Sequence, residues 1–423
     1  MRGYRFIVEF TMKFLFGLIS LLIVTSASAN VTFNTAHQEE NTHAAQQAPY
    51  VLLISIDGFR WDYVEKYQPK FLSNWVKDSA RLEALRPSFP TKTFPNHLSI
   101  VTGSYPQRHG IMANRFYAPD LDKHYALSDP KAVLNPDFYL VKPLWVLAEE
   151  QGMRTSAYFW PGSEAAIAGK TPTFFQNYDH HQPHQDRINT VIKWYNLPEA
   201  RRPHLTTMYF HDVDSAGHEY GQDSQELRQA IANVDDSLRD LITKLAKLPI
   251  EVNVVIVSDH GMAQRNREDF EKLPSWVNEE YYVKGTGPIT HIYDTKGSKR
   301  TLAETTALLN KQAKHFKCYR YQDIPARYNS SQSNRIGDIA CLADKDWAIG
   351  MVSHRPLGDH GWSQFNSTDM NGIFYAKGPA FEKNVVQPIS ENINIMPLLA
   401  RILNIKITHE IDGTADALAP LLK

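Results

Sequence analysis

Buried strands and one long helix can be predicted from the pattern of apolar and polar positions along the chain. Four apolar runs have the length and continuity of parallel strands that are buried on both faces. They span residues 50–56, 205–210, 252–257 and 372–376. Between the second and third runs, apolar side chains recur every three or four residues from Leu227 to Leu248, and Pro249 follows. This spacing predicts an amphipathic helix. Strands that alternate with helices indicate an α/β fold with a doubly wound, mostly parallel sheet flanked by helices.

Two segments lack clear periodicity. Residues 159–203 are rich in Pro, Gly, His and aromatic residues, and we interpret them as an inserted cap near the site. Residues 285–347 form a second irregular insertion. We therefore expect one catalytic domain over residues 49–423 with these two insertions, preceded by a linker over residues 30–48.

The first thirty residues have a different character. An uninterrupted apolar run from Phe14 to Val24 leads into small residues that end at Ala29. This pattern predicts a signal peptide over residues 1–29, with Met12, which Lys13 follows, as an alternative start. The run is short for a membrane span, although an uncleaved anchor is the alternative. We expect an exported protein of the bacterial periplasm without a stable membrane span in the mature chain.

Composition and cysteine content narrow the class of protein. The chain is 43% hydrophobic and 22% charged with a formal net charge of -1. These values exclude a disordered chain and a broad basic surface for nucleic-acid polymers. Cys318 and Cys341 are the two cysteines. In an oxidising compartment such a pair tends to form a disulfide, which we predict; two buried free thiols are the alternative.

Acidic and histidine residues follow three of the four apolar runs. Asp57, Asp214 and Asp259 come at or shortly after the ends of the first three runs. The carboxyl ends of parallel strands share one edge of a sheet, where ligands gather. Each such residue alone is more often part of an ordinary turn or surface pair. These aspartates, Thr93 and three histidines farther along the chain together give seven candidate ligands: Asp57, Thr93, Asp214, His218, Asp259, His260 and His360. Carboxylates and imidazoles are ligands that zinc prefers where cysteine is absent, and seven suffice for two ions.

Thr93 has the sequence context of a helix N-terminus. It precedes the apolar stretch from Leu98 to Val101, and Pro95 fits the first turn of a helix. Backbone N–H groups and the helix dipole favour anions there. Metal coordination can activate a threonine hydroxyl without a neighbouring base. The alternative is a threonine that only caps the helix.

Several ordered blocks of sequence resemble one known family. They are Ile54-Ser55-Ile56-Asp57-Gly58-Phe59-Arg60, Pro90 to His97, Thr102-Gly103, Tyr105-Pro106, His109-Gly110-Ile111 with Asn114, Phe159-Trp160-Pro161-Gly162-Ser163, Asp214-Ser215-Ala216-Gly217-His218, Ser258-Asp259-His260-Gly261-Met262 and Asp359-His360-Gly361. The resemblance is to the nucleotide pyrophosphatase/phosphodiesterase family of the alkaline phosphatase superfamily, and it covers nearly all of residues 50–422.

The resemblance implies two Zn²⁺ ions per chain. The residues that match the ligands of one ion are Asp57, Thr93, Asp259 and His260, and those that match the other are Asp214, His218 and His360. Thr93 matches the nucleophile, which forms a covalent nucleotidyl intermediate. Asn114 matches a side chain that donates to a phosphate oxygen together with a backbone amide near Thr93. Phe94 and Tyr178 match two aromatics that enclose a nucleobase. We expect Lys92 either to attract phosphate by its charge or to be a solvated surface residue.

The expected function is zinc-dependent hydrolysis of phosphodiester and pyrophosphate bonds in nucleotides and their derivatives, with release of nucleoside monophosphates. Residues 210–214 lack the usual Glu-Glu-Pro, and Glu164 replaces a more frequent Asp, but neither change removes a ligand. The alternatives are a phosphodiesterase for choline-type or lysophospholipid headgroups, a phosphomonoesterase, and a non-catalytic binding protein. A monoesterase would need extra positive charge, and no suitable arginine adjoins Thr93. A binding protein would have lost a ligand or the nucleophile.

Overall fold

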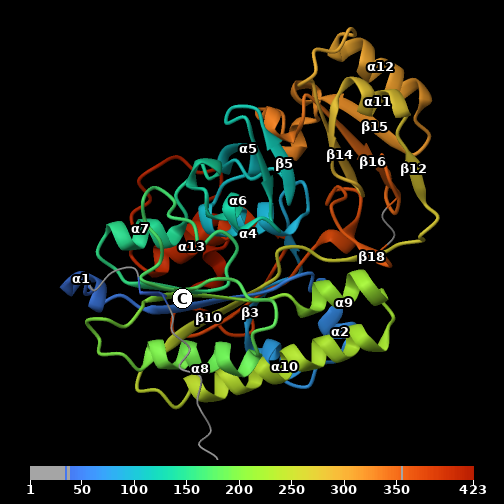
Figure 1. The fold of residues 1–423 in the computed structure, drawn as a ribbon. Helices are drawn as coiled ribbons and strands as arrows, with labels where there is room; N and C mark the ends of the chain where they lie inside the picture. The colour runs from blue at the N-terminus through green and yellow to red at the C-terminus, as the bar shows by residue number, and fades with distance from the viewer. Residues whose placement is uncertain (1–33, 36–38, 354–355) are drawn as a thin grey trace, which may run out of the picture. The chain divides into compact units, whose positions relative to one another are not determined.

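The first three predicted strands are confirmed, and they are direct neighbours. In the computed structural model, which describes residues 34–35, 39–353 and 356–423, β2 (Tyr50–Ile56) pairs in parallel with β9 (Leu205–Phe210) and with β10 (Val252–Val257). They form the middle of a nine-stranded sheet with the order β1-β8-β7-β9-β2-β10-β19-β3-β20 (Figure 1). The remaining strands of this sheet are β1 (Asn34–Thr35), β3 (Ala80–Leu82), β7 (Thr155–Tyr158), β8 (Phe174–Gln176), β19 (Phe374–Lys377) and β20 (Val386–Gln387).

The direction predicted for the fourth run is wrong. β19 is a strand of the central sheet, but it runs antiparallel to β10, with Phe374 opposite Val257. The chain returns to the sheet at the edge where β10 ends, and the N–H of Ser258 donates to the carbonyl oxygen of Ile373 at 3.1 Å. A strand that starts there without a crossover has to run back along its neighbour. An apolar run indicates burial and carries no information about direction.

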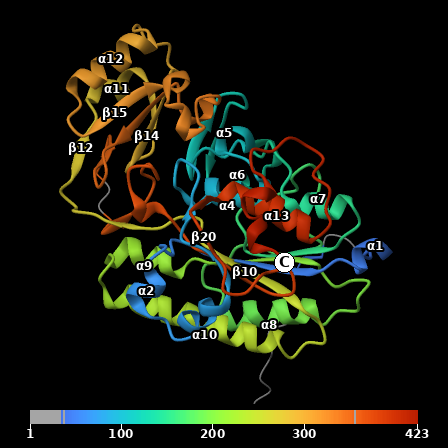
Figure 2. The same ribbon diagram turned by 180° about the vertical axis from the view of Figure 1, so that it is seen from behind.

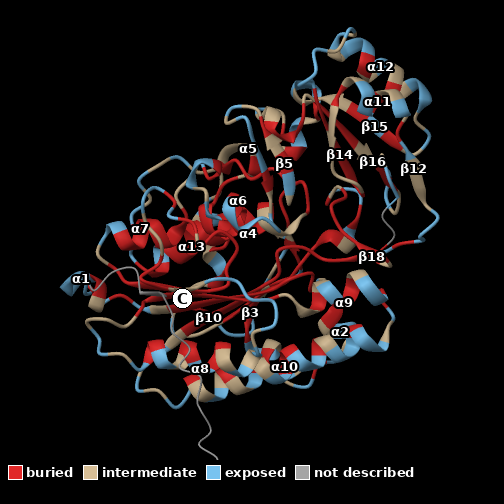
Figure 3. Cartoon of the chain, viewed as in Figure 1, coloured by how far each residue is buried: buried red, intermediate tan, exposed pale blue. Residues whose placement is uncertain are grey.

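Helices cover both faces of the sheet, as the α/β prediction requires. Leu52 and Ile54 of β2 pack on one face with α8 (His184–Tyr195) and α10 (Gln225–Leu245), and Val51 and Leu53 pack on the other with α4 (Thr93–Thr102), α7 (Leu144–Glu150) and α13 (Ile395–Ile402). Figure 2 shows the same two layers from behind, and Figure 3 shows that the strands between them are buried. The side chains alternate between faces because successive residues of a strand point to opposite sides.

The long amphipathic helix is confirmed as α10. Its N-cap is Ser224, whose hydroxyl accepts a hydrogen bond from the N–H of Leu227 at 3.1 Å. The helix ends at Leu245, one turn before Pro249. The remaining α-helices are α1 (His43–Gln46), α2 (Tyr63–Tyr67), α3 (Leu72–Trp75), α5 (Pro106–His109), α6 (Pro130–Leu134), α9 (Asp212–Tyr220), α11 (Ser275–Glu280) and α12 (Leu302–Gln312).

Both segments that were expected to be irregular contain regular structure. Within residues 159–203, β8 extends the central sheet in parallel to β7, and α8 covers that sheet. Within residues 285–347, β14 (Ile289–Tyr293), β16 (Ile339–Ala343) and β15 (Phe316–Arg320) join β13 (Tyr282–Lys284) in an antiparallel sheet with its own buried core. Cys318 and Cys341 are directly opposite in β15 and β16 and form the predicted disulfide. Strands this short have too few residues for a clear alternating pattern.

Four small two-stranded sheets complete the β-structure of the described residues. They pair β4 (Leu85–Arg86) with β21 (Ser390–Glu391), β5 (Arg115–Ala118) with β6 (Lys123–Ala126), β11 (Ala263–Gln264) with β18 (Gly358–Asp359), and β12 (Phe270–Lys272) with β17 (Ala348–Gly350).

The predicted signal peptide, with Met12 and the cleavage point after Ala29, lies outside the described residues. In the predicted linker over residues 30–48, the described part includes β1, which pairs with β8, and the short helix α1. None of the helices in the described part of the chain has the length and apolar content needed to cross a bilayer.

Candidate active site

Three carboxylates meet at one edge of the central sheet. Asp57 directly follows β2, Asp259 follows β10, and Asp214 lies in the first turn of α9, the helix after β9. Gly58 has a φ of +67°, and a Cβ atom added there would lie 2.9 Å from the Cα atom of Asp214. A glycine therefore permits both the left-handed turn after β2 and the close approach of α9. The sheet topology brings together the three acids that the sequence singled out.

The first group of predicted ligands surrounds the Nε2 atom of His260. This nitrogen lies 3.0 Å from Asp259 Oδ2, 3.4 Å from Asp57 Oδ1 and 3.4 Å from Thr93 Oγ1. His260 Nδ1 lies 2.9 Å from the carbonyl oxygen of Gly261. A carbonyl oxygen can only accept, so the ring proton of a neutral imidazole is on Nδ1. The Nε2 lone pair then faces two carboxylates and a hydroxyl, which is a suitable arrangement around a cation.

The second group consists of Asp214, His218 and His360. Asp214 Oδ1 lies 3.5 Å from the Nε2 atom of each histidine, and the two Nε2 atoms are 3.1 Å apart. His218 Nδ1 lies 2.7 Å from the carbonyl oxygen of Gly358, and His360 Nδ1 lies 2.7 Å from that of Thr91. These carbonyls place the proton of each neutral ring on Nδ1. Two Nε2 lone pairs facing each other at this distance repel unless a cation lies between them.

The polar atoms of both groups fit metal ions on independent grounds. Asp57 Oδ1, Asp214 Oδ1 and Asp259 Oδ2 are buried and have no hydrogen-bond partner among the described residues. An unpaired buried carboxylate is costly, and a bound cation removes that cost. Burial, followed by the charge of the neighbouring carboxylates, raises the pKa of Asp57 and of Asp259 well above the ordinary value. Burial, followed by the neighbouring His260 and Lys92, lowers the pKa of His360 far below its usual value, so this ring is neutral, as a ligand must be.

Geometry alone groups the ligands almost as the sequence did. Asp57, Asp259 and His260 place one ligand atom each within 4.8 Å of one another, in agreement with the first predicted set. His260 also satisfies this criterion with Asp214 and His360, because the rings of His260 and His360 are stacked 3.6 Å apart. The two sets are therefore adjacent and meet at this pair of rings.

Thr93 is the first residue of α4, which confirms the predicted helix start. Lys92 is the N-cap, with extended backbone (φ −120°, ψ 156°), and Pro95 lies in the first turn. His97 lies in α4, one turn after Thr93, and is buried against Ser55 of β2 and Tyr209 of β9. Its Nδ1 atom donates to the carbonyl oxygen of Thr93 at 2.9 Å, and its Nε2 atom accepts from Ser55 Oγ at 2.8 Å. Burial lowers the pKa of His97 to about 3, so its ring is neutral and fixes the start of α4 against β2.

A cavity of about 570 Å³ opens onto both groups of ligands. The predicted site residues that line it are Asp57, Thr93, Phe94, Asn114, Tyr178, Asp214, His218 and His360. Apolar side chains from Leu127, Val133 and Phe159 contribute to the wall. A cavity of this size with apolar walls and a few convergent polar groups is typical of a small-molecule site.

Phe94 and Tyr178 line the same cavity, where the sequence predicted an aromatic pair. Tyr178 is 45% exposed, and its ring meets that of Phe159 edge-on at 5.3 Å. Its backbone N–H donates to Glu164 Oε1 at 2.5 Å, which ties the residue to the segment after β7. The Tyr178 ring thus packs edge-on against Phe159 while a large part of the residue stays exposed.

The structure gives Lys92 contacts that the sequence did not predict. Its ammonium group lies 3.2 Å from Asp359 Oδ1 and also donates to the carbonyl oxygen of His360. The Lys92 side chain is only 18% exposed, and Lys92 does not belong to the described residues that line the cavity. A solvated surface position does not describe this side chain, and its contact with phosphate stays a prediction. Asp359, which the sequence analysis gave no role, is its partner.

A pair of histidines beside Tyr178 was also missed. The rings of His180 and His211 are 3.9 Å apart, both line the cavity, and the Tyr178 hydroxyl lies 3.1 Å from His180 Nδ1. Burial lowers the pKa of His211 to about 4. The departure from the usual Glu-Glu-Pro at residues 210–214 was the available signal for His211, whereas its contact with His180 could not be read from the sequence.

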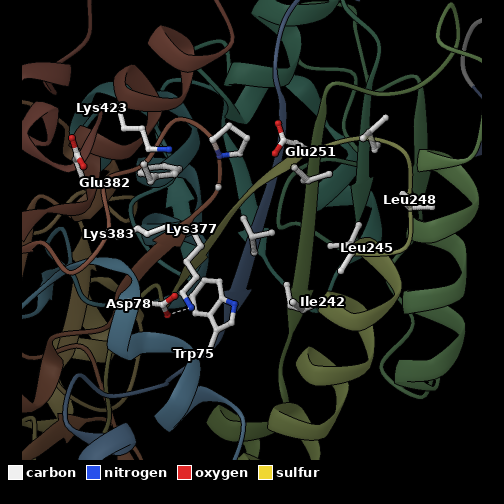
Figure 4. Close-up of a pocket in the computed structure, with 17 residues that line it drawn as sticks. Trp75, Asp78, Ile242, Leu245, Leu248, Glu251, Lys377, Glu382, Lys383 and Lys423 are labelled. Atoms are coloured by element: carbon white, nitrogen blue, oxygen red, sulfur yellow. Dashed lines mark hydrogen bonds and ion pairs between the residues drawn. The ribbon is translucent and has the colours of Figure 1, made fainter.

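Another cavity, of about 580 Å³, lies away from the predicted chemistry (Figure 4). It is formed where β10 begins and β19 ends, with Trp75, Ile242 and Leu245 among the residues that line it. Lys377 pairs there with Asp78. This cavity contains none of the predicted ligands or the nucleophile. The charges around it are of both signs, and we assign it no function.

Comparison with known proteins agrees with this site. A family profile described as "Type I phosphodiesterase / nucleotide pyrophosphatase" matches residues 51–363. Rat ectonucleotide pyrophosphatase/phosphodiesterase family member 3 is 33% identical over 403 residues, which cover 91% of this chain and 45% of the rat protein. Bovine bis(5'-adenosyl)-triphosphatase ENPP4 is 33% identical over 375 residues, covering 86% of this chain and 80% of the bovine protein.

A solved structure extends the comparison to the fold. The murine ectonucleotide pyrophosphatase/phosphodiesterase 5, an inactive variant in complex with AMP, superimposes with a TM-score of 0.83 at 29% identity, and the match covers 89% of this chain and all of that one. The chain spans about half the length of several of the curated relatives it matches, such as the rat protein. The profile match, the sequence identity and the shared fold show that this chain belongs to the type I phosphodiesterase/nucleotide pyrophosphatase family, a family of hydrolases.

Proposed function

We propose that the chain is a two-zinc phosphodiesterase that cleaves phosphodiester and pyrophosphate bonds in nucleotides and nucleotide derivatives. The proposed reaction releases a nucleoside monophosphate through a covalent intermediate on Thr93. One observation carries this proposal: Thr93 Oγ1 lies in the same cavity as two adjacent Asp/His groups and two aromatic rings.

The proposed metal ligands follow the two groups described above. One ion would be held by Asp57, Thr93, Asp259 and His260, and the other by Asp214, His218 and His360. When bound, such ions supply positive charge that favours the deprotonated nucleophile and stabilises the leaving oxygen. The share of imidazole in the donor set favours zinc over magnesium.

Thr93 is placed to attack a phosphorus atom from the start of α4. The positive end of the α4 dipole favours an anion there, although the N–H of Phe94 already donates to Asn114 Oδ1 and Pro95 has no N–H. In the proposed first step, Thr93 loses its hydroxyl proton to solvent, Oγ1 forms a bond to phosphorus, and the bond to the leaving oxygen breaks, with the electron pair departing on that oxygen. In the second step, water attacks the same phosphorus and releases Thr93 with its proton restored. Asn114 would donate its side-chain N–H to a non-bridging oxygen in both steps.

The aromatic pair supports a nucleotide substrate. Phe94 and Tyr178 line the cavity that contains Thr93, and aromatic rings stack on any nucleobase. The names of the relatives point in the same direction, because one is called a bis(5'-adenosyl)-triphosphatase and another was solved with AMP. Other relatives are named as ectonucleotide enzymes, which agrees with the export proposed from residues 1–29. We propose the bacterial periplasm as the compartment.

Steady-state rates on a panel of substrates test the proposal. The panel contains ATP, a nucleotide sugar, a nitrophenyl nucleotide ester, a bis-nitrophenyl phosphate, a nitrophenyl phosphate and a phosphocholine ester. We expect the highest kcat/KM on substrates that contain a nucleoside monophosphate, and no turnover of any of them by Thr93→Ala. A preference for the phosphocholine ester would replace the nucleotide proposal by the headgroup alternative. A preference for the nitrophenyl phosphate would indicate a monoesterase.

A further inference from the structure

A buried ion pair links the segment that ends at Thr93 to the segment that carries His360. Lys92 Nζ lies 3.2 Å from Asp359 Oδ1, and the two side chains are 18% and 5% exposed. The same ammonium donates to the carbonyl oxygen of His360. Solvent and salt screen such a pair less than they screen an ion pair on the surface. Lys92, which precedes the proposed nucleophile, is therefore paired with Asp359, which precedes a proposed metal ligand.

The two segments are joined by further hydrogen bonds. The carbonyl oxygen of Thr91 lies 2.7 Å from His360 Nδ1, and the Thr91 hydroxyl accepts from the N–H of Gly361 at 2.8 Å and donates to the carbonyl oxygen of Trp362 at 3.0 Å. A Cβ atom added at Gly361 would lie 2.5 Å from Lys92 Cε. The glycine therefore leaves room for the lysine stem, and the ion pair belongs to an ordered junction.

Asp359 lies close enough to the second group to become a ligand itself. His218, Asp359 and His360 each place a potential ligand atom within 4.8 Å of the others. The contacts of Asp359 are all with other groups: Oδ1 accepts from the N–H of His360 at 2.8 Å and from Lys92, and Oδ2 lies 3.8 Å from Arg265 Nη1. A carboxylate within metal-ligand range is thus held by positively charged side chains.

We propose that Lys92 is a positioning residue that retains the Asp359 carboxylate in an ion pair and so prevents it from becoming an additional ligand of the ion held by Asp214, His218 and His360. This inference rests on the proposed function. A catalytic metal site keeps a coordination position open for substrate or water, whereas a structural site is closed by protein ligands. A fourth protein ligand would make the second ion more tightly bound and less useful in the reaction.

The test is a double-mutant cycle with Lys92→Met, Asp359→Asn and the combined variant. Three quantities are measured: kcat and KM on a nitrophenyl nucleotide ester, and the rate at which zinc is lost to a chromogenic chelator. For Lys92→Met we expect kcat to fall at least about tenfold, with KM changed by less than about threefold. We also expect the second zinc equivalent to leave more slowly than in the wild type. Adding Asp359→Asn should restore both kcat and the zinc release, because the competing carboxylate is then gone.

A matched control removes a lysine from an ion pair elsewhere. Lys66 lies 2.9 Å from Asp223, outside the cavity that contains Thr93, so Lys66→Met should leave kcat and zinc release unchanged. Lys92→Arg, which keeps the charge, should retain most of the activity. Thermal unfolding of each variant monitors folding, and Lys92→Gln, which keeps a donor for the carbonyl of His360, replaces Lys92→Met if that protein does not fold.

The outcomes separate this inference from the proposed function. The role proposed for Lys92 is overturned if the wild type shows metal-dependent turnover and Lys92→Met releases zinc at the wild-type rate. It is also overturned if adding Asp359→Asn does not relieve the defect of Lys92→Met. A wild-type protein that turns over equally well with and without zinc would instead contradict the proposed function, on which this inference depends.

Discussion

The Oδ1 atom of Asn114 lies 2.9 Å from the backbone nitrogen of Phe94, the residue after the proposed nucleophile. Because an N–H group donates, the amide end of Asn114 that faces Phe94 must be its oxygen. The NH₂ group of Asn114 is then left for the cavity that both residues line. The side chain is thus oriented by the helix that carries Thr93.

Asn114→Asp should separate the two hydrogen-bonding roles of this side chain. The aspartate can still accept from Phe94 N–H, but it has no donor for a phosphate oxygen and adds negative charge. We expect kcat to fall by about 10²–10³-fold, as for the loss of an oxyanion donor. Thermal unfolding and zinc content should stay close to those of the wild type. Near-native kcat in this variant would exclude Asn114 from the reaction.

Thr93→Ala should abolish turnover while both zinc ions remain bound. Six Asp and His ligands are intact in this variant, and only the attacking oxygen is lost. Thr93→Ser, which keeps the hydroxyl, should retain partial activity. Turnover by rapid-quench or steady-state assay is measured beside the zinc content by mass spectrometry. Substantial turnover by the alanine variant would rule out the covalent mechanism.

Loss of a ligand from either group should be equally severe. We expect His360→Ala and Asp259→Ala to lose nearly all activity and about one zinc equivalent each, because neither ion can replace the other. A chelator should inactivate the wild type, and added zinc should restore it. His315→Ala is a suitable control, since this ring stacks on Trp347 and does not line the cavity that contains Thr93. Full activity of metal-free protein would contradict the assignment.

Tyr178→Ala tests the proposed recognition of the base. If the ring stacks on a nucleobase with about 1–3 kcal/mol, its removal should lower kcat/KM on nucleotide esters by roughly tenfold to a hundredfold. A bis-nitrophenyl phosphate has no base, so its hydrolysis should change less. The ratio of the two effects isolates the stacking contribution. Equal losses on both substrates would mean that Tyr178 supports the cavity wall, and the headgroup alternative would gain support.

The effect of zinc on thermal stability should depend on pH. Burial raises the folded-state pKa of Asp57 and Asp259 above the ordinary value of 3.8 in the metal-free protein. At pH values between the ordinary pKa and the raised folded-state pKa, the folded metal-free protein holds more protons than the unfolded chain. These two groups therefore contribute less stability as pH rises. A bound cation replaces those protons. The increase in Tm on adding zinc should therefore grow as pH is raised from about 5 to about 7.5. A zinc-induced shift that is constant or shrinks over this range would contradict the assignment of the two carboxylates.

The sequence predicted the centre of the fold because burial leaves a strong pattern. The runs that became β2, β9 and β10 are apolar throughout, and the residues that follow them lie at one edge of the sheet. The same property made β19 misleading, since an antiparallel strand between two covered faces is as apolar as a parallel one. The strands within residues 285–347 were not predicted, because strands of five residues are hard to recognise in a sequence until their pairing partners are known.

The parts of the site that escaped prediction depend on contacts between distant segments. Lys92 and Asp359 are far apart in sequence, as are His180 and His211, and no local spacing indicates that these side chains meet. The proposed ligands and nucleophile could be singled out because metal chemistry restricts them to a few residue types. A charge that neutralises another charge can come from anywhere on the chain, so its role emerges only from the fold.

The neighbouring positions of β9, β2 and β10 also determine when a metal site can exist during folding. The first proposed set of ligands runs from Asp57 to His260 and the second from Asp214 to His360, so segments that are remote in sequence must meet before either set is complete. Pairings this remote in sequence form slowly. In the proposed two-zinc protein, metal binding would therefore follow the assembly of the sheet and stabilise it, and a chain truncated before His360 would lack a complete second site and the stabilisation proposed for the second ion.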